Sequence, residues 1–181
     1  MRILKIAGIV ICLLIIGLLF NDWSVETKKK IVYINSYHAG HPSSDEIMEG
    51  FVRNMPSDSF DVHSFYMDTK RNPSKEFIVK RAAELLDTIV TINPDVLVVS
   101  DDNAVKYIVE PNLKSLSIPI IFCGVNWTDK EYNLPKNQVT GSVEILPVAD
   151  ALTSIKKYYP SMEKLLVLNE NTTTSRKEEQ I

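Results

Sequence analysis

The chain has 181 residues, of which 45% are hydrophobic and 24% charged, so it is long enough for one globular domain, or one and part of another. Removing the five basic and two acidic residues of segment 1–30 from totals of 20 and 23 leaves 15 and 21, a net charge of −6. Such an acidic surface repels phosphate backbones and argues against a nucleic-acid partner. Cys12 lies in an apolar run and Cys123 is alone in the remainder, which excludes an intramolecular disulfide there.

Residues 1–27 have the pattern of a signal peptide or a membrane anchor. Arg2 and Lys5 precede "IAGIVICLLIIGLLF", an uncharged run of 15 residues. A small-x-small cleavage site does not follow the run, and Cys12 lacks the small residue that precedes it in a lipoprotein signal. These features favour an uncleaved anchor that keeps Arg2 and Lys5 in the cytoplasm and the chain from about Asn21 onward outside. The lysines of segment 28–30, on the other side of the run, oppose this orientation. We therefore expect an extracytoplasmic protein that is membrane-anchored or secreted.

Four segments of the remaining chain read as strands. The run at 31–35 is rich in β-branched residues and predicts a buried strand, and "FDVHSFYMD" predicts a weaker strand at a sheet edge. "VLVVS" and "IPIIFCGV" predict a third and a fourth strand, both apolar enough to be covered on two faces.

Helical patterns separate these strands. Ser43 or Ser44 is expected to cap a first helix, and Ser74 caps a long amphipathic second helix that "INPD" ends. A shorter third helix runs towards Pro111. Strands that alternate with helices predict an α/β fold, a doubly wound parallel sheet with helices on both faces.

A further unit begins after the fourth strand. "VTGSVEI" predicts an extended segment, Val148, Leu152 and Ile155 share one side of a helix, and "KLLVLN" predicts one more buried strand. About a dozen polar residues then end the chain. Nothing follows to cover this last strand, which would expose an apolar face and an unpaired edge.

Polar and aromatic side chains follow the predicted strands where each strand ends. The candidate ligand-binding residues are Ser36 and Tyr37 after the first strand, Ser100, Asp101, Asp102 and Asn103 after the third, and Asn126 and Trp127 after the fourth. Open parallel sheets bind ligands at this edge, because helix N-termini and loop amides converge there. Hydroxyls, amides, carboxylates and two aromatic rings suit a small polar solute that has an apolar part.

Other roles are open for the same residues. A helix cap explains Ser100 or Asp101 alone, but one cap needs only one side chain. A small α/β hydrolase could use Asp101 or Asp102, yet adjacent carboxylates on a turn point in different directions, so no catalytic residue is assigned. His38 and His41 match no strong metal signature, and isolated glycines form no phosphate loop. We expect no metal and no cofactor.

Four ordered motifs carry a resemblance to a known family. "VYINSYHAGHPSSDEIMEGF", "DTKRNP", "VSDDNAVKYIVEP" and "IPIIFCGVNW" resemble the periplasmic-binding-protein-like domain of the ABC transporter substrate-binding family. The same domain occurs as the extracytoplasmic sensor of membrane histidine kinases. The resemblance covers roughly residues 30 to 170 and implies a two-lobed type I binding protein, not an enzyme, in which an amino-acid-like solute closes a hinged cleft.

The resemblance also implies a division of the chain. Residues 28–145 would form lobe one and carry the candidate contacts, with Gly141 to Ile145 as the first hinge crossing. Residues 146–181 would then be the incomplete start of lobe two, so we expect a truncated fragment, or a chain that another polypeptide completes. The implied partners are a small-molecule solute and either an ABC permease or a signalling output domain, with membrane attachment through the N-terminal segment.

Overall fold

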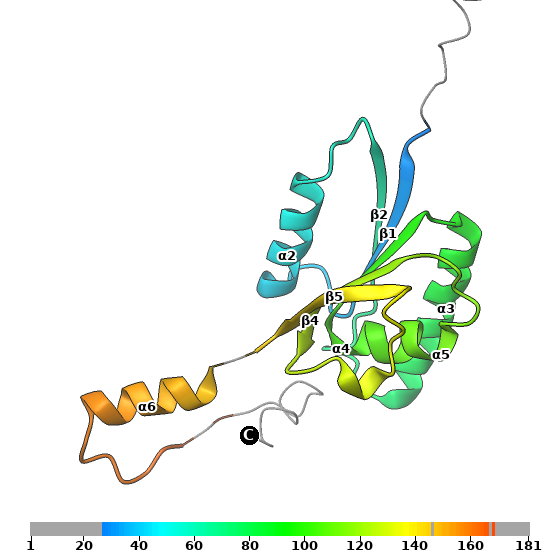
Figure 1. The fold of residues 1–181 in the computed structure, drawn as a ribbon. Helices are drawn as coiled ribbons and strands as arrows, with labels where there is room; N and C mark the ends of the chain where they lie inside the picture. Colours follow the sequence, from blue (N-terminus) through cyan, green and yellow to red (C-terminus); the bar gives the residue numbers. More distant parts are fainter. Residues whose placement is uncertain (1–26, 146, 167, 169–181) are drawn as a thin grey trace, which may run out of the picture.

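Five parallel strands form a single sheet in the order β2-β1-β3-β4-β5 (Figure 1). The computed structural model describes residues 27–145, 147–166 and 168. The strands are β1 (Lys29–Asn35), β2 (Phe60–Tyr66), β3 (Val96–Ser100), β4 (Ile120–Asn126) and β5 (Val139–Glu144). The predicted α/β fold with a doubly wound parallel sheet is confirmed, and β2 lies at an edge as its polar sequence predicts.

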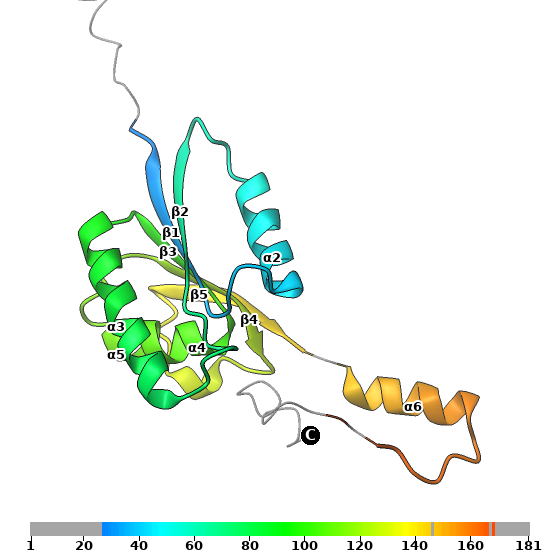
Figure 2. The same cartoon turned by 180° about the vertical axis from the view of Figure 1, so that it is seen from behind.

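Helices cover both faces of the sheet. On one face lies α2 (Pro42–Arg53), and on the other lie α3 (Lys75–Ile92), α4 (Asp101–Ala104), the π-helical turn η1 (Val105–Val109) and α5 (Glu110–Asn112) (Figures 1 and 2). A 3-10 turn, η2 (Lys130–Tyr132), lies between β4 and β5. Because both faces are covered, β1 and β3 can be continuous β-branched runs.

Two cores hold the layers together. The larger core lies between the sheet and α3, α4 and η1, and includes Leu85 and Ile89 of α3 and Ile108 of η1. The smaller core lies between the sheet and α2, where Ile31, Tyr33 and Val98 meet apolar residues of the helix.

The strand order reverses beside β1. The chain passes from β1 to β2 on one side and then to β3 on the other, so that α2 and α3 lie on opposite faces. Sheets of this order bind ligands where the order reverses, at the carboxyl ends of the strands. The topology therefore directs attention to the residues that follow β1 and β3.

Of the predicted helix N-caps, one is confirmed and another is wrong. Ser74 caps α3, since its Oγ accepts a hydrogen bond from the amide of Phe77 at 3.3 Å. The cap predicted at Ser43 or Ser44 is wrong, because His41 is the N-cap of α2 and Pro42 takes the first turn, where a missing N–H is harmless. Ser44 is buried instead and donates to Asn35 Oδ1 at 2.6 Å.

The pairing of β4 with β5 contains a bulge. Between Phe122 and Val125, two residues of β4 oppose one residue of β5, and Gly124 takes up the irregularity with φ of 67°. Gly141 on β5 lies so close to Phe122 that a Cβ atom there would overlap its carbonyl oxygen and ring. The two glycines therefore allow the close approach of these strands.

The chain beyond β5 leaves the sheet. Helix α6 (Val148–Tyr158) forms as predicted and projects away from the rest of the molecule (Figures 1 and 2). The strand predicted at "KLLVLN" is wrong for its described residues: Leu165, Leu166 and Leu168 are outside any strand and are 47%, 82% and 85% exposed. A strand needs a neighbour for its backbone hydrogen bonds, and the five-stranded sheet lies elsewhere.

The N-terminal segment predicted as a signal peptide or anchor lies, up to residue 26, outside the described residues. Within the described part of the chain, no helix has the length and apolar character needed to cross a membrane.

Candidate functional site

The carboxyl edge of the sheet is marked by left-handed backbone. Asp68, Asp101 and Trp127 follow β2, β3 and β4 and have φ values of 57°, 67° and 66°. This conformation is unfavourable for residues other than glycine, and it concentrates at binding and catalytic sites. Three of the five strands are thus followed by backbone that the local sequence alone does not favour.

Asp101 lies at the centre of this edge. It is 8% exposed, it accepts a hydrogen bond from the side chain of Tyr37, and its Oδ2 atom has no hydrogen-bond partner among the described residues. A Cβ atom on Gly124 would lie 3.4 Å from Asp101 Oδ1, so the β4 backbone packs directly against the carboxyl.

The pKa of Asp101 is raised from 3.8 to about 7. Burial is the main cause, and the charges of Asp102 and Glu144 add to it. The hydrogen bond from Tyr37 and the charge of Lys70 act in the opposite direction but are weaker. Asp101 is therefore a carboxyl that can exchange its proton near neutral pH.

Asp102 has a different environment, although it is the next residue. Its Oδ1 accepts a hydrogen bond from Tyr132 Oη at 2.5 Å, and its Oδ2 accepts one from Asn126 Nδ2 at 2.7 Å. Asp102 is 2% exposed, and burial together with this bond raises the pKa of Tyr132. The Asp102 carboxylate thus ties α4 to the end of β4 and to η2.

Ser36 replaces the expected cap of α4. Its Oγ donates to Ser100 O at 2.6 Å and accepts a hydrogen bond from the amide of Ala104 at 2.9 Å. The helix cap considered for Ser100 or Asp101 is absent, since the side chain of Ser100 makes no cap hydrogen bond. The serine that directly follows β1 therefore satisfies the amide of Ala104, the last residue of α4.

Asn103 and Thr69 extend this network to the loop after β2. Asn103 Nδ2 donates to Thr69 Oγ1 at 2.9 Å, and Thr69 Oγ1 donates to Ser36 O at 2.7 Å. The ends of β1, β2 and β3 are thereby joined by side-chain hydrogen bonds.

Two aromatic residues border Asp101 and the end of β4. The ring of Tyr37 lies 4.7 Å from the ring of His41, and Lys70 Nζ lies 5.2 Å from the Tyr37 centroid. Trp127 is half-buried, and its amide donates to Glu144 O at 2.8 Å.

Three buried polar atoms at this edge lack hydrogen-bond partners among the described residues. They are Ser100 Oγ, Asp101 Oδ2 and Trp127 Nε1. A buried polar atom without a partner costs about 1–3 kcal/mol, so a ligand that bonds to these atoms would recover that free energy. A hydroxyl, a carboxyl oxygen and an indole N–H together offer both donors and acceptors.

All eight residues predicted from the sequence lie at this edge. Direct contacts join Ser36 with Ser100, Tyr37 with Asp101, and Asp102 with Asn126. Sequence reasoning missed Tyr132, Gly124 and Glu144, which contact or influence the two aspartates. A single tyrosine in a polar loop gave no pattern that could have revealed Tyr132.

The histidines near this edge do not gather metal ligands. His38 Nδ1 lies 3.7 Å from Asp68 Oδ1, and Arg71 already donates to both oxygens of that carboxylate, at 2.7 and 2.9 Å. Within the described ranges, no group of three or more His, Cys, Asp or Glu side chains could hold a metal ion.

The fold of the chain is similar to that of solved structures of other proteins. No family model and no curated protein matches the chain. The ABC domain in complex with L-Trp from Streptococcus pneumoniae is similar in structure, with a TM-score of 0.62 and 17% identity, over 85% of this chain and 51% of that one. CD0873, a substrate-binding protein with adhesive properties from Clostridium difficile, gives a TM-score of 0.52 and 16% identity over 84% of this chain and 51% of its own, in its ligand-free, open structure.

At these identities the likeness shows the fold alone. The chain has the architecture of one lobe of a substrate-binding protein, and it spans about half the length of both solved structures.

Proposed function

We propose that this chain is the first lobe of an extracytoplasmic solute-binding protein of the ABC transporter type, and that it binds a small amino-acid-like solute at the carboxyl edge of its sheet. The observation that carries the proposal is Asp101, a buried carboxyl with one unpartnered oxygen at the point where the strand order reverses. The similar structure that holds L-Trp supports the choice of an amino acid as the first candidate.

The buried polar atoms without partners and two aromatic rings define the expected contacts. Asp101 would accept hydrogen bonds from the ammonium group of the solute, while Trp127 Nε1 and Ser100 Oγ would bond to its polar oxygens. The rings of Tyr37 and Trp127 would cover its apolar part. Such a site combines a few fixed polar groups with aromatic surface, as small-molecule sites usually do.

The other candidate residues position the loops that would carry these contacts. Ser36, Asp102, Asn103 and Asn126 already hold hydrogen bonds that join the strand ends. Direct contact of these four residues with a solute stays a prediction, and we assign them the positioning of the loops that carry Tyr37, Asp101 and Trp127.

A second surface is expected to close the site. In a two-lobed protein the segment from Gly141 to Ile145 would be the first hinge crossing, residues 146–181 would begin the opposing lobe, and a separate polypeptide would complete it unless the chain is a truncated fragment. An ABC permease would then receive the solute. A signalling output domain would take its place if the chain is the sensor of a membrane histidine kinase, which uses the same site.

The rival enzyme hypothesis makes a separate prediction. A hydrolase that uses Asp101 or Asp102 would lose turnover in an Asp101→Asn variant while it still binds its substrate. We expect the variant to bind more weakly, with no turnover in the wild-type protein to lose.

A thermal-shift screen of the full-length chain against amino acids and small organic solutes tests the proposed function. A solute that binds only the native state, and that is present at a concentration 100 times its Kd, stabilises the native state by about 2.7 kcal/mol and must raise Tm. We expect a rise with at least one amino acid, reduced in Asp101→Asn and kept in Asp87→Asn, a matched change at an exposed position on α3. No shift with any solute would contradict the proposal.

A further inference from the structure

Charged and titratable groups approach Asp101 from every side. Tyr37 reaches it from the loop after β1, Lys70 from the loop after β2, Asp102 from α4 and Glu144 from the end of β5. Two of these groups are acidic and one is basic. An ionised Asp101 would therefore add a further negative charge to a region that is already acidic and, at Asp101 itself, shielded from water.

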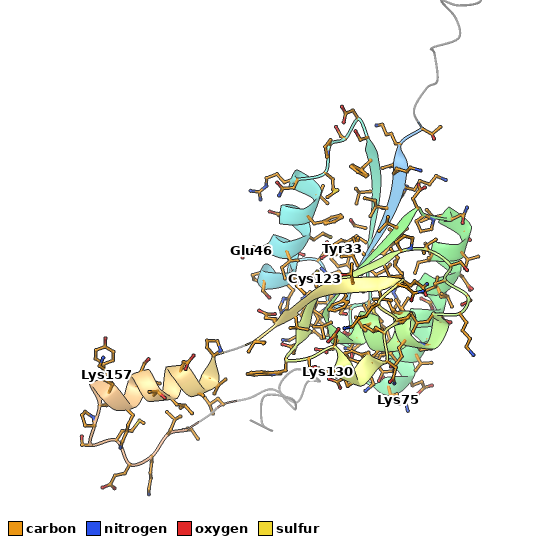
Figure 3. The ribbon with its side chains drawn as sticks, viewed as in Figure 1. Tyr33, Glu46, Lys75, Cys123, Lys130 and Lys157 are labelled. Atoms are coloured by element: carbon orange, nitrogen blue, oxygen red, sulfur yellow. The ribbon has the colours of Figure 1, made fainter. Side chains whose placement is uncertain are left out.

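Two more titratable groups lie on the α2 side of the sheet. Tyr33 and Cys123 are close together there (Figure 3), with the tyrosine oxygen 3.9 Å from the sulfur. Burial raises the pKa of Tyr33 and the pKa of Cys123, and the charge of Asp101 contributes to both shifts. Both side chains are therefore neutral near pH 7, and neither supplies a positive charge to balance an aspartate.

The geometry distinguishes Asp101 from Asp102. Asp102 accepts hydrogen bonds on both oxygens from Tyr132 and Asn126, which is the environment of a carboxylate. Asp101 accepts one bond from Tyr37 and leaves Oδ2 unpartnered. The pKa of about 7 agrees with this difference.

We infer that the empty site carries a proton on Asp101 and that a cationic group of the solute displaces it, so that binding releases one proton. The Asp101 O–H bond breaks, the proton passes to water, and an ammonium N–H group bonds to the carboxylate oxygen. At Asp101 one positive charge replaces another, so the pair formed by the Asp101 carboxylate and the ammonium group carries no net charge. This inference rests on the proposed function and adds the charge of the solute and a dependence of binding on pH.

The exchange predicts how affinity varies with pH. Below the pKa of Asp101, Kd should rise tenfold for each unit by which the pH falls, because one proton competes with the solute. Well above that pKa, Kd should be independent of pH. A solute that lacks the ammonium group should not show this tenfold rise of Kd at low pH.

The first test needs no solute. Carboxyl 13C resonances of the full-length chain are followed by NMR as a function of pH, and Asp101 is assigned by the loss of its signal in Asp101→Asn or by backbone correlation in the wild-type protein. We expect Asp101 to titrate with a midpoint within about one unit of pH 7. A midpoint for Asp101 below about 5 would overturn the inference and leave the proposed function standing.

The second test measures the released proton. Isothermal titration calorimetry with L-tryptophan at pH 6, in buffers that differ in ionisation enthalpy, gives the number of protons exchanged. We expect release of nearly one proton from the wild-type protein and from Asp87→Asn, and none from Asp101→Asn or when indole-3-propionate, which lacks the ammonium group, replaces L-tryptophan. Binding of L-tryptophan without proton release would overturn the inferred proton exchange and leave the proposed function standing. If neither L-tryptophan nor any other amino acid binds, both the inference and the proposed function are rejected.

Discussion

Asp101 combines a left-handed backbone with a buried carboxyl that has one unpartnered oxygen. Each of these features is unfavourable by about 1–3 kcal/mol. The surrounding fold imposes them, since Gly124 packs against the carboxyl and the α4 amides begin at this residue. We therefore assign this residue a role in binding a solute, and not a role in stabilising the fold.

The stability of the protein should depend on Asp101 through pH. The folded state holds the proton with a pKa of about 7, against an ordinary value of 3.8, so it binds the proton more tightly than the unfolded chain does. The contribution is fully present below about pH 4 and is lost as the pH rises through 7. We expect a loss on the order of 2–4 kcal/mol between pH 4 and pH 8 from this group.

Urea unfolding at several pH values measures this effect. The loss should be much smaller in Asp101→Asn, which cannot ionise, and unchanged in the exposed control Asp87→Asn. An Asp101→Asn variant with the same pH profile as the wild-type protein would contradict the account of this carboxyl.

Ser36 should stabilise α4. Replacing Ser36 with Ala removes the acceptor of the Ala104 amide and the donor to Ser100 O, both of which are buried. We expect a loss of about 1–3 kcal/mol in the free energy of unfolding. Ser43→Ala, at an exposed position in α2, is the control and should change stability by less than about 0.5 kcal/mol. Equal effects of the two substitutions would show that the Ser36 contacts contribute little.

Among the elements, the β4–β5 pair depends most on glycine. A Cβ atom at Gly141 would overlap Phe122, so Gly141→Ala must push β5 away from the sheet. We expect Gly141→Ala to destabilise the protein by about 1–3 kcal/mol.

Gly50→Ala is the matched control, because a Cβ atom at Gly50 in the middle of α2 meets nothing within 4 Å. It should stabilise the helix by about 0.5–1 kcal/mol. Thermal unfolding of both variants gives the comparison, and a Gly141→Ala variant as stable as the wild-type protein would show that β5 is not held in this register.

Helix α6 should contribute little to the stability of the lobe. Leu152 is 39% exposed on α6, while Leu85 of α3 is 2% exposed in the larger core. We expect Leu85→Ala to cost about 2–5 kcal/mol and Leu152→Ala less than about 0.5 kcal/mol by urea unfolding. A larger cost at Leu152 would mean that α6 packs against the lobe in solution.

The elements were predictable where their signals are local. The β-branched runs of β1 and β3 and the cap at Ser74 depend on residues within a few positions of one another. The Ser36 cap and the bond between Asp102 and Tyr132 join residues 68 and 30 positions apart, so no local pattern contains them. The "KLLVLN" strand failed for the same reason, because a strand depends on a neighbour that the sequence does not identify.

At the scale of the whole molecule, the position of the candidate site could be predicted from the topology. Once alternating elements indicated a parallel sheet, the strand ends could be expected to meet at one edge, and all eight candidate residues lie there. Their individual roles did not follow, because two adjacent aspartates look alike in sequence. Only the structure shows that Asp102 is bonded to protein groups while Asp101 keeps an unpartnered oxygen.

The most direct test of the central claim is to map bound solute onto the lobe by NMR. The amide resonances of the full-length chain are recorded during a titration with the amino acid that gives the largest thermal shift. We predict saturable shifts at the carboxyl edge, for Tyr37, Asp101 and Trp127, and unchanged resonances at the opposite edge, for Lys29 and Asp95. Shifts confined to the opposite edge or to the outer face of α3 would contradict the claim.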